Sequence, residues 1–319
     1  SSLENKFKKL IFFLTISSLI SFSILIVDSY YQYLNGINFI GLLYDGDRLS
    51  SLFGEEKKLG SYISRLTPIF LGFILYLYHD SKRIILLSLL YVLLLDVLVL
   101  LSGERSSIFY IFFSTLLILI LISRWKIYRL VAFIGSLIIS VVILISNQQV
   151  QDRVINKTLS QLNLFGDKIN FFSIQHQVIY STSIKIFVDN PIKGVGPKNF
   201  REICKIEKYK TYNINDQSIN GCQSHPHNTY IQLLTETGIL GLLFILILFF
   251  YIIRLFLYQF YYLYFLKISF IKDYKVCFYI AIFITLWPII PTGSFFNNWL
   301  SIIYFFPVGF ILRDYKIKN

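Results

Sequence analysis

The residues best suited to chemistry in this sequence are His227 and Asn228, which stand just before a long apolar run. An imidazole titrates near neutral pH, so His227 could take a proton from a hydroxyl group or orient it. Nine residues separate Asn228 from Gly238, and Gly241 follows. The missing side chains of the two glycines would let another helix or a lipid-linked ligand approach closely. The simpler interpretation is that His227 is a polar residue at the start of a helix and Asn228 is its N-cap.

Two arginines form a second group of candidates. Arg48 and Arg105 lie in short polar loops beside apolar stretches. A guanidinium group donates several charge-assisted hydrogen bonds to a diphosphate without losing its proton. The alternatives are that Arg48 anchors the chain to lipid headgroups and that Arg105 pairs with its neighbour Glu104.

Three further polar residues could support the same chemistry. Arg201 is a third cation, and it follows a glycine-rich turn at 194–197 that lacks the parallel-sheet context of a nucleotide-binding loop. His176 lies on an expected amphipathic helix, where a lone histidine is more often a surface residue than part of a cavity. Glu236 would orient a cation or lie on the surface of its helix.

Cysteines near the histidines suggest either a metal site or a disulfide. Cys222, His225 and His227 have a spacing that zinc could use, but the sequence offers no evident fourth ligand. Cys204 and Cys222 lie in one predicted external loop, so we expect them to form a disulfide in an oxidising compartment. We therefore predict no metal.

The elements that must position these residues are membrane-spanning helices. Of 319 residues, 55% are hydrophobic and only 15% are charged, and the apolar stretches are too numerous for a soluble core. We predict an all-α polytopic membrane helix bundle with about eight spans. These are Leu10–Val27, Leu66–Tyr78, Ile84–Leu101, Ile108–Ile122, Leu130–Ile145, Ile239–Ile253, Val276–Ile290 and Trp299–Leu312.

The net charge of +12 sets the expected orientation. Nucleic-acid binding would also suit such a charge, but most lysines and arginines fall on one side of the membrane if both termini are cytoplasmic. Arg48 and Arg105 then lie on the opposite, periplasmic side, which favours a binding function. The whole chain forms one transmembrane domain, and a long periplasmic loop at 146–229 carries short helices, including one over 172–188.

Two apolar segments carry separate expectations. Leu255–Ile271 is apolar enough for a ninth span, but no turn separates it from the sixth, so we interpret it as a cytoplasmic extension or an interfacial helix. Asp96 lies inside the third span and should have a partner or face a cavity, because an unpaired charge there is costly.

The order of these motifs resembles the O-antigen ligase and polymerase family, an all-helical membrane fold related to the GT-C glycosyltransferases. The histidine segment at 225–241 is the most specific part of the resemblance. It is supported by the residues at 31–38, 48–62, 103–105 and 189–201.

The resemblance implies that a glycan is transferred from an undecaprenyl diphosphate-linked oligosaccharide, without cofactor, at the periplasmic face of the bacterial inner membrane. Arg48 and Arg105 would bind the diphosphate, and His227 would activate the acceptor. Lipid A-core is the acceptor of a ligase, which the nine-residue spacing favours, and a second lipid-linked glycan is the acceptor of a polymerase. A protein acceptor is a further alternative. Family members usually have more than eight spans, so spans before Leu10 are expected to be missing.

Two other classes are weaker alternatives. A transporter or flippase of the same lipid-linked glycans would need ionisable residues at mid-membrane and paired broken helices. Here the ionisable candidates gather near one face, and only Asp96 lies deep. A purely structural membrane scaffold would leave the histidine motif without a function. The expected partners are membrane lipids and lipid-linked glycans, with no nucleic acid.

Overall fold

The computed structural model describes residues 2–162, 170–213 and 218–313. These residues form helices and loops, and the only β-pairing among them is two isolated bridges. The contacts divide the chain into two compact units. The first unit comprises Ser1–Ile155, Leu255–Thr285 and Phe306–Asn319, and the second comprises Asn156–Arg254 and Leu286–Phe305.

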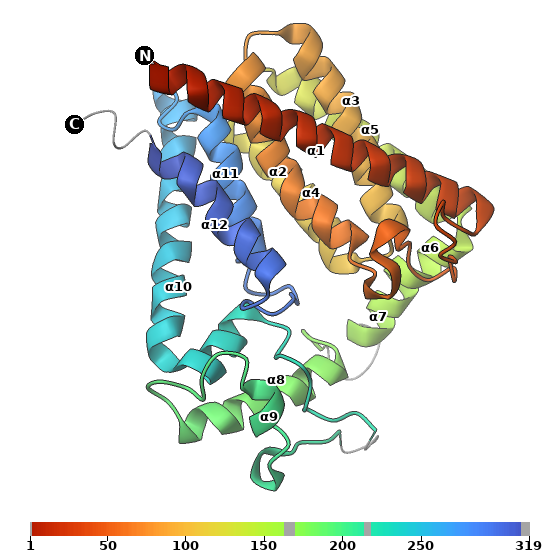
Figure 1. The fold of residues 1–319 in the computed structure, drawn as a ribbon, viewed down its shortest axis with the longest axis vertical. Helices are drawn as coiled ribbons and strands as arrows, with labels where there is room; N and C mark the ends of the chain where they lie inside the picture. Colours follow the sequence, from red (N-terminus) through yellow and green to blue (C-terminus); the bar gives the residue numbers. More distant parts are fainter. Residues whose placement is uncertain (1, 163–169, 214–217, 314–319) are drawn as a thin grey trace. The chain divides into compact units, whose positions relative to one another are not determined.

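The first unit is a bundle of long apolar helices (Figure 1). Helix α2 packs against α1, α3, α4 and α11, and α5 packs against α3. Two short helical segments, α6 and η2, follow α5. The bounds are α1 Ser2–Asn35, η1 Ser51–Glu56, α2 Leu59–Tyr78, α3 Lys82–Leu101, α4 Arg105–Leu121, α5 Lys126–Ser146, α6 Gln148–Gln151, η2 Asp152–Asn156 and α11 Asp273–Thr285.

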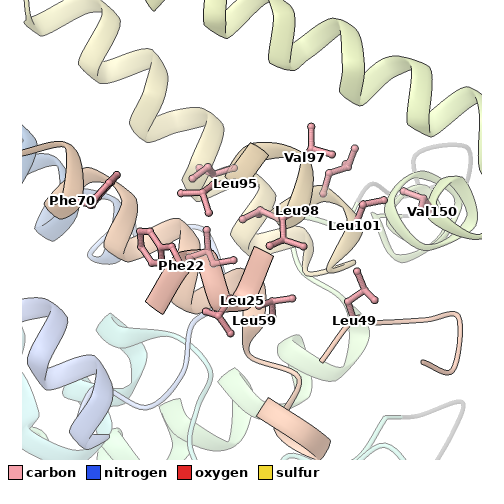
Figure 2. Packing of buried hydrophobic residues seen from close by; sticks show 14 of the residues in the cluster. Phe22, Leu25, Leu49, Leu59, Phe70, Leu95, Val97, Leu98, Leu101 and Val150 are labelled. Carbon is pink, nitrogen blue, oxygen red and sulfur yellow. The ribbon is translucent and has the colours of Figure 1, made fainter. Parts of the chain in front are cut away.

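Buried side chains of α1, α2 and α3 form the core of this unit (Figure 2). The ring of Phe22 meets that of Phe70 edge-on, with 5.6 Å between the centroids. Leu49, from the loop after α1, and Val150, from α6, belong to the same cluster. The core therefore extends to the loop that carries Arg48 and to α6.

Each predicted span overlaps a helix of the structure, although α11 ends at Thr285 and the predicted span Val276–Ile290 extends beyond it. Five helices are long and apolar enough to cross a membrane: Glu4–Asn35, Leu59–Tyr78, Lys82–Leu101, Lys126–Ser146 and Thr229–Leu266. Arg105–Leu121 and Asn298–Arg313 (α12) are shorter apolar helices. Length and composition thus identify the chain as an all-helical transmembrane protein.

The apolar stretch after the sixth predicted span continues the same helix. Helix α10 runs over Thr229–Tyr261 and is followed by the π turn η4, Tyr262–Leu266. The Gln259 amide donates a hydrogen bond to the carbonyl oxygen of Leu121 (2.9 Å), at the C-terminal end of α4. The structure shows no separate helix between η4 and α11, so Leu255–Ile271 begins as an extension of α10.

The loops of the first unit gather at two ends of its bundle. At one end, the Trp125 indole donates to the carbonyl oxygen of His79 (3.1 Å), joining the turn after α4 to the turn after α2. At the other end, the Glu104 carboxylate accepts hydrogen bonds from the N-terminus of α2. Arg48 and Arg105 both lie at this second end of the bundle.

Asp96 of α3 lines an apolar cavity between α2, α3, α4 and α5. Ser88, Thr115 and Arg129 are among the other polar residues of its lining. Facing a cavity is one of the two situations expected for a carboxyl group inside a span, and this expectation is confirmed.

The second unit holds most of the polar segment between the fifth and sixth predicted spans. The helix predicted over 172–188 is present as α8, Ile174–Asp189. Ile179 and Ile186 of α8 pack against Phe200 and Cys204. Cys204 is joined to Cys222 by a disulfide, with 5.1 Å between the Cα atoms. The remaining short elements are α7 Lys157–Leu162, α9 Phe200–Ile203 and η3 Glu207–Tyr209.

Candidate active site

Polar side chains at the C-terminal end of α1 fix the loop that carries Arg48. The buried Asp28 carboxylate accepts hydrogen bonds from the Ser51 hydroxyl (2.5 Å) and the Phe39 N–H (3.1 Å). The buried Gln32 side chain accepts another from the Ser51 N–H (2.8 Å). Because these bonds satisfy both α1 side chains and the loop backbone, the loop has a defined position at the end of the bundle.

Arg48 lies in this loop, directly before a residue of the core cluster. The next residue, Leu49, is fully buried. The Arg48 N–H donates to the Asp45 carboxylate (3.3 Å), and the pKa of Asp45 falls to about 2 because Lys57 hydrogen-bonds to it. The Arg48 Nε is buried without a hydrogen-bond partner among the described residues. A buried guanidinium N–H without a partner costs free energy that a bound anion would recover.

Glu104 fixes the turn that comes just before Arg105, the first residue of α4. Its carboxylate accepts hydrogen bonds from the backbone N–H groups of Gly60 (2.8 Å) and Ser61 (3.1 Å), in the first turn of α2, and from the Ser107 hydroxyl (3.1 Å). The acid therefore caps α2 from another loop, where a negative charge also complements the helix dipole. Burial raises the pKa of the Glu104 carboxyl, and the nearby Arg48 charge opposes that rise.

A third arginine, Arg153 of η2, lies beside the other two. Its Nε donates to the Gly103 carbonyl oxygen (3.3 Å), and its Nη1 is 3.2 Å from the Asp47 carboxylate. A Cβ atom on Gly103, which has φ +67°, would lie 3.4 Å from the Arg153 side chain and 3.6 Å from that of Arg48. Burial and the Arg48 charge lower the pKa of Arg153. Burial and the charges of Arg153 and Arg48 lower the pKa of Arg105.

Three of the four histidines form a cluster in the second unit. The ring centroids of His225 and His227 are 4.0 Å apart, and those of His176 and His227 are 5.8 Å apart. Burial lowers the pKa of His227. In the described part of the chain, no hydrogen bond of the His227 imidazole is seen. A neutral imidazole with a free nitrogen can accept a proton from a hydroxyl group.

His176 is less exposed than the sequence predicted. A surface position was expected, but the ring is half-buried beside His227, and its Nδ1 lies 2.7 Å from the Ser173 hydroxyl, which also caps α8. The sequence could not show the contact between His176 and His227, because the two residues are far apart in the chain.

His227 is held at the start of α10 by its neighbours. Its backbone is left-handed, with φ +58°, and its carbonyl oxygen accepts a hydrogen bond from the Thr292 N–H (2.9 Å). The Asn228 side chain accepts from the N–H groups of Tyr230 and the following residue (2.9 and 3.1 Å). Asn228 is therefore the N-cap of α10, and its amide also donates to the Pro288 carbonyl oxygen (2.7 Å).

Glu236 lies two turns further along α10 and is fully buried. Its carboxylate accepts hydrogen bonds from the Gln232 amide (2.9 Å) and the Phe200 N–H (3.1 Å). Its carbonyl oxygen accepts another from the Gly196 N–H (2.8 Å). The alternative of a helix-surface position for Glu236 is therefore wrong, because this residue ties the glycine-rich turn to α10.

Of the two motif glycines, Gly238 admits a close approach by the chain's own backbone. It has φ +67° and interrupts the regular geometry of α10, and a Cβ atom there would overlap the Ile192 carbonyl group. Gly194 is its counterpart, since a Cβ atom there would overlap the backbone of Glu236. At Gly241 a side chain would meet Thr237 of the same helix.

Arg201 and Cys222 are the remaining candidates. The Arg201 side chain is exposed, and its Nε donates to the Lys198 carbonyl oxygen (3.3 Å). Cys222 is bound in the disulfide, which removes its thiolate as a zinc ligand. Within the described ranges, no group of three histidine, cysteine or acidic side chains has the arrangement of a metal site.

The O-antigen ligase family model matches residues 89–246, roughly half of the chain. The match includes Arg105, Arg153 and the whole segment from His225 to Gly241. This match supports assignment of the chain to the O-antigen ligase and polymerase family. A comparison with the curated proteins finds no match. The match and the apolar helices fit a membrane glycosyltransferase of lipopolysaccharide biosynthesis with ligase-like or polymerase activity.

Proposed function

We propose that this protein transfers a glycan from an undecaprenyl diphosphate-linked oligosaccharide to an acceptor hydroxyl at the periplasmic face of the inner membrane. The observation that carries the proposal is His227, because its half-buried imidazole lies between two other histidines, has a lowered pKa and belongs to the segment matched by the family model. The arginine cluster in the first unit supports the same proposal, since it offers guanidinium groups to a diphosphate.

In the proposed reaction, Arg48 and Arg105 bind the diphosphate. The bond between the anomeric carbon and the diphosphate oxygen breaks, and undecaprenyl diphosphate leaves with the electron pair. The arginines stabilise the negative charge that develops on this leaving group. The acceptor oxygen bonds to the anomeric carbon, and His227 takes its proton. No metal or cofactor takes part, and Arg201 is a further diphosphate-binding candidate.

The proposed orientation follows from the distribution of charge. Eight spans with cytoplasmic termini leave the lysine-rich turns after α2 and α4 in the cytoplasm. The end of the bundle with Arg48 and Arg105 then faces the periplasm, as does the segment at 146–229.

The proposed acceptor is lipid A-core, because the spacing from Asn228 to Gly238 is closer to that of ligases. The purified protein is incubated with lipid-linked repeats, with and without lipid A-core, and the products are identified by mass spectrometry. A glycan attached to lipid A-core is expected. Longer lipid-linked chains without lipid A-core would identify a polymerase instead, and folded protein that yields neither product would overturn the proposed function.

A further inference from the structure

We infer that Arg153 is a third arginine that binds the diphosphate of the lipid-linked donor, together with Arg48 and Arg105. The inference rests on the proposed function and adds a residue to its binding site. Arg153 lies in a polar segment without a recognisable motif, and only the folded chain brings it to the other two.

The segment before Arg153 is anchored on the loop that carries Arg48. The Asn147 amide donates to the Tyr33 hydroxyl (2.6 Å), at the end of α1. Val150 is buried in the core cluster with Leu49, the residue after Arg48. The position of Arg153 relative to Arg48 is therefore set by the same core that holds the loop.

A second close contact strengthens this anchor. The Gln149 side chain packs on Gly46, where a Cβ atom would lie only 3.3 Å from its amide nitrogen. The π turn η2 then directs Arg153 toward the turn before α4, where its Nε reaches the Gly103 carbonyl oxygen. A single π turn is often found at functional sites.

The acidic residues around this cluster are mostly engaged elsewhere. Asp45 pairs with Lys57, and Glu104 caps α2. Asp47 is 3.2 Å from Arg153, so it neutralises part of the cluster. Burial and the neighbouring guanidinium charges lower the pKa of Arg105 and of Arg153. A ligand with two negative charges would relieve the repulsion within the cluster.

A nearby arginine, Arg65, has a structural role. Arg65 of α2 lies over the Tyr110 ring, with 4.4 Å from the guanidinium carbon to the ring centroid, and it donates to the Ser61 hydroxyl. It packs α2 against α4 and is not part of the proposed diphosphate site.

The experiment measures binding of undecaprenyl diphosphate to the purified full chain in detergent. The variants are Arg153→Lys and Arg48→Lys, and Arg83→Lys is the matched control, because Arg83 is exposed at the opposite end of α3. Lysine keeps the charge but loses the planar fork, so Arg153→Lys should weaken binding about ten-fold or more. Arg83→Lys should bind like the unaltered protein.

The outcomes separate the inference from the proposed function. If the unaltered protein does not bind undecaprenyl diphosphate, the proposed function fails. If Arg48→Lys weakens binding and Arg153→Lys does not, only the inference is overturned. Competition by phosphatidylglycerol at equal concentration would identify a lipid-headgroup site and would also overturn the inference.

A second variant distinguishes binding from a structural role. Asp47→Asn removes the carboxylate that pairs with Arg153 and leaves the guanidinium in place. If Arg153 binds the diphosphate, this variant should bind undecaprenyl diphosphate as well as the unaltered protein or more tightly. A loss as large as that of Arg153→Lys would mean that the ion pair alone matters, and the inference would be wrong.

Discussion

At the residue scale, His227 is the side chain on which transfer should depend most. His227→Ala removes the proposed base, so turnover should fall about 10²–10⁴-fold. Binding of undecaprenyl diphosphate should persist, because the arginines provide it. The measurement compares turnover and binding in the same preparation, with His225→Ala as the milder control. Near-normal turnover by folded His227→Ala protein would remove the central claim.

The pH dependence of turnover tests the same residue in another way. Only the neutral imidazole can accept a proton, so activity is lost as the pH falls through the pKa of His227. Burial places that pKa below the ordinary value of 6.5, and the acidic limb of the profile should therefore lie below pH 6.5. A limb above that value would show that a nearby negative charge outweighs burial when substrate is bound.

The candidate residues differed in how visible they were in the sequence. His227 and Asn228 could be identified because the motif places them directly before an apolar helix. Arg153 could not, because its proximity to Arg48 depends on the contacts of α6 with the loop after α1. The burial of Glu236 was equally hidden, since its partner Phe200 is distant in the sequence.

At the element scale, the interruption of α10 at Gly238 should be essential to the fold of the second unit. Gly238→Ala forces a side chain into a left-handed backbone and against the Ile192 carbonyl group. We expect a loss of about 1–3 kcal/mol or more in the free energy of unfolding. Gly309→Ala is the control, because a Cβ atom there meets no atom within 4 Å.

Thermal unfolding in detergent measures both glycine variants. The midpoint should fall clearly for Gly238→Ala and change little for Gly309→Ala. Equal midpoints for the two variants would show that the backbone around Gly238 relaxes without cost.

Helix existence was easier to predict than helix length. The first predicted span ends at Val27, but α1 continues to Asn35. Hydropathy falls there because Asp28 and Gln32 are polar, although both are buried and hydrogen-bonded to the following loop. A hydropathy pattern cannot distinguish such polar residues from those that end a helix.

At the scale of the whole molecule, the orientation in the membrane is the main prediction to test. Single cysteines replace Lys82, Lys126 or Lys157 in a Cys277→Ala background, and intact cells are treated with an impermeant thiol reagent. The positive-inside distribution predicts labelling at position 157 and protection at 82 and 126. Protection at 157 together with labelling at 82 would invert the proposed topology.

Glu104 is a structural residue that a mutational scan of this protein could mistake for a catalytic one. Its carboxylate holds the first turn of α2, so its replacement should disturb the turn before Arg105 and the packing of α2 together. In a screen scored by transfer activity, replacement of Glu104 would lower the score much as replacement of the proposed base His227 would. The cause would be lost helix capping, and a separate measure of protein abundance would expose the difference.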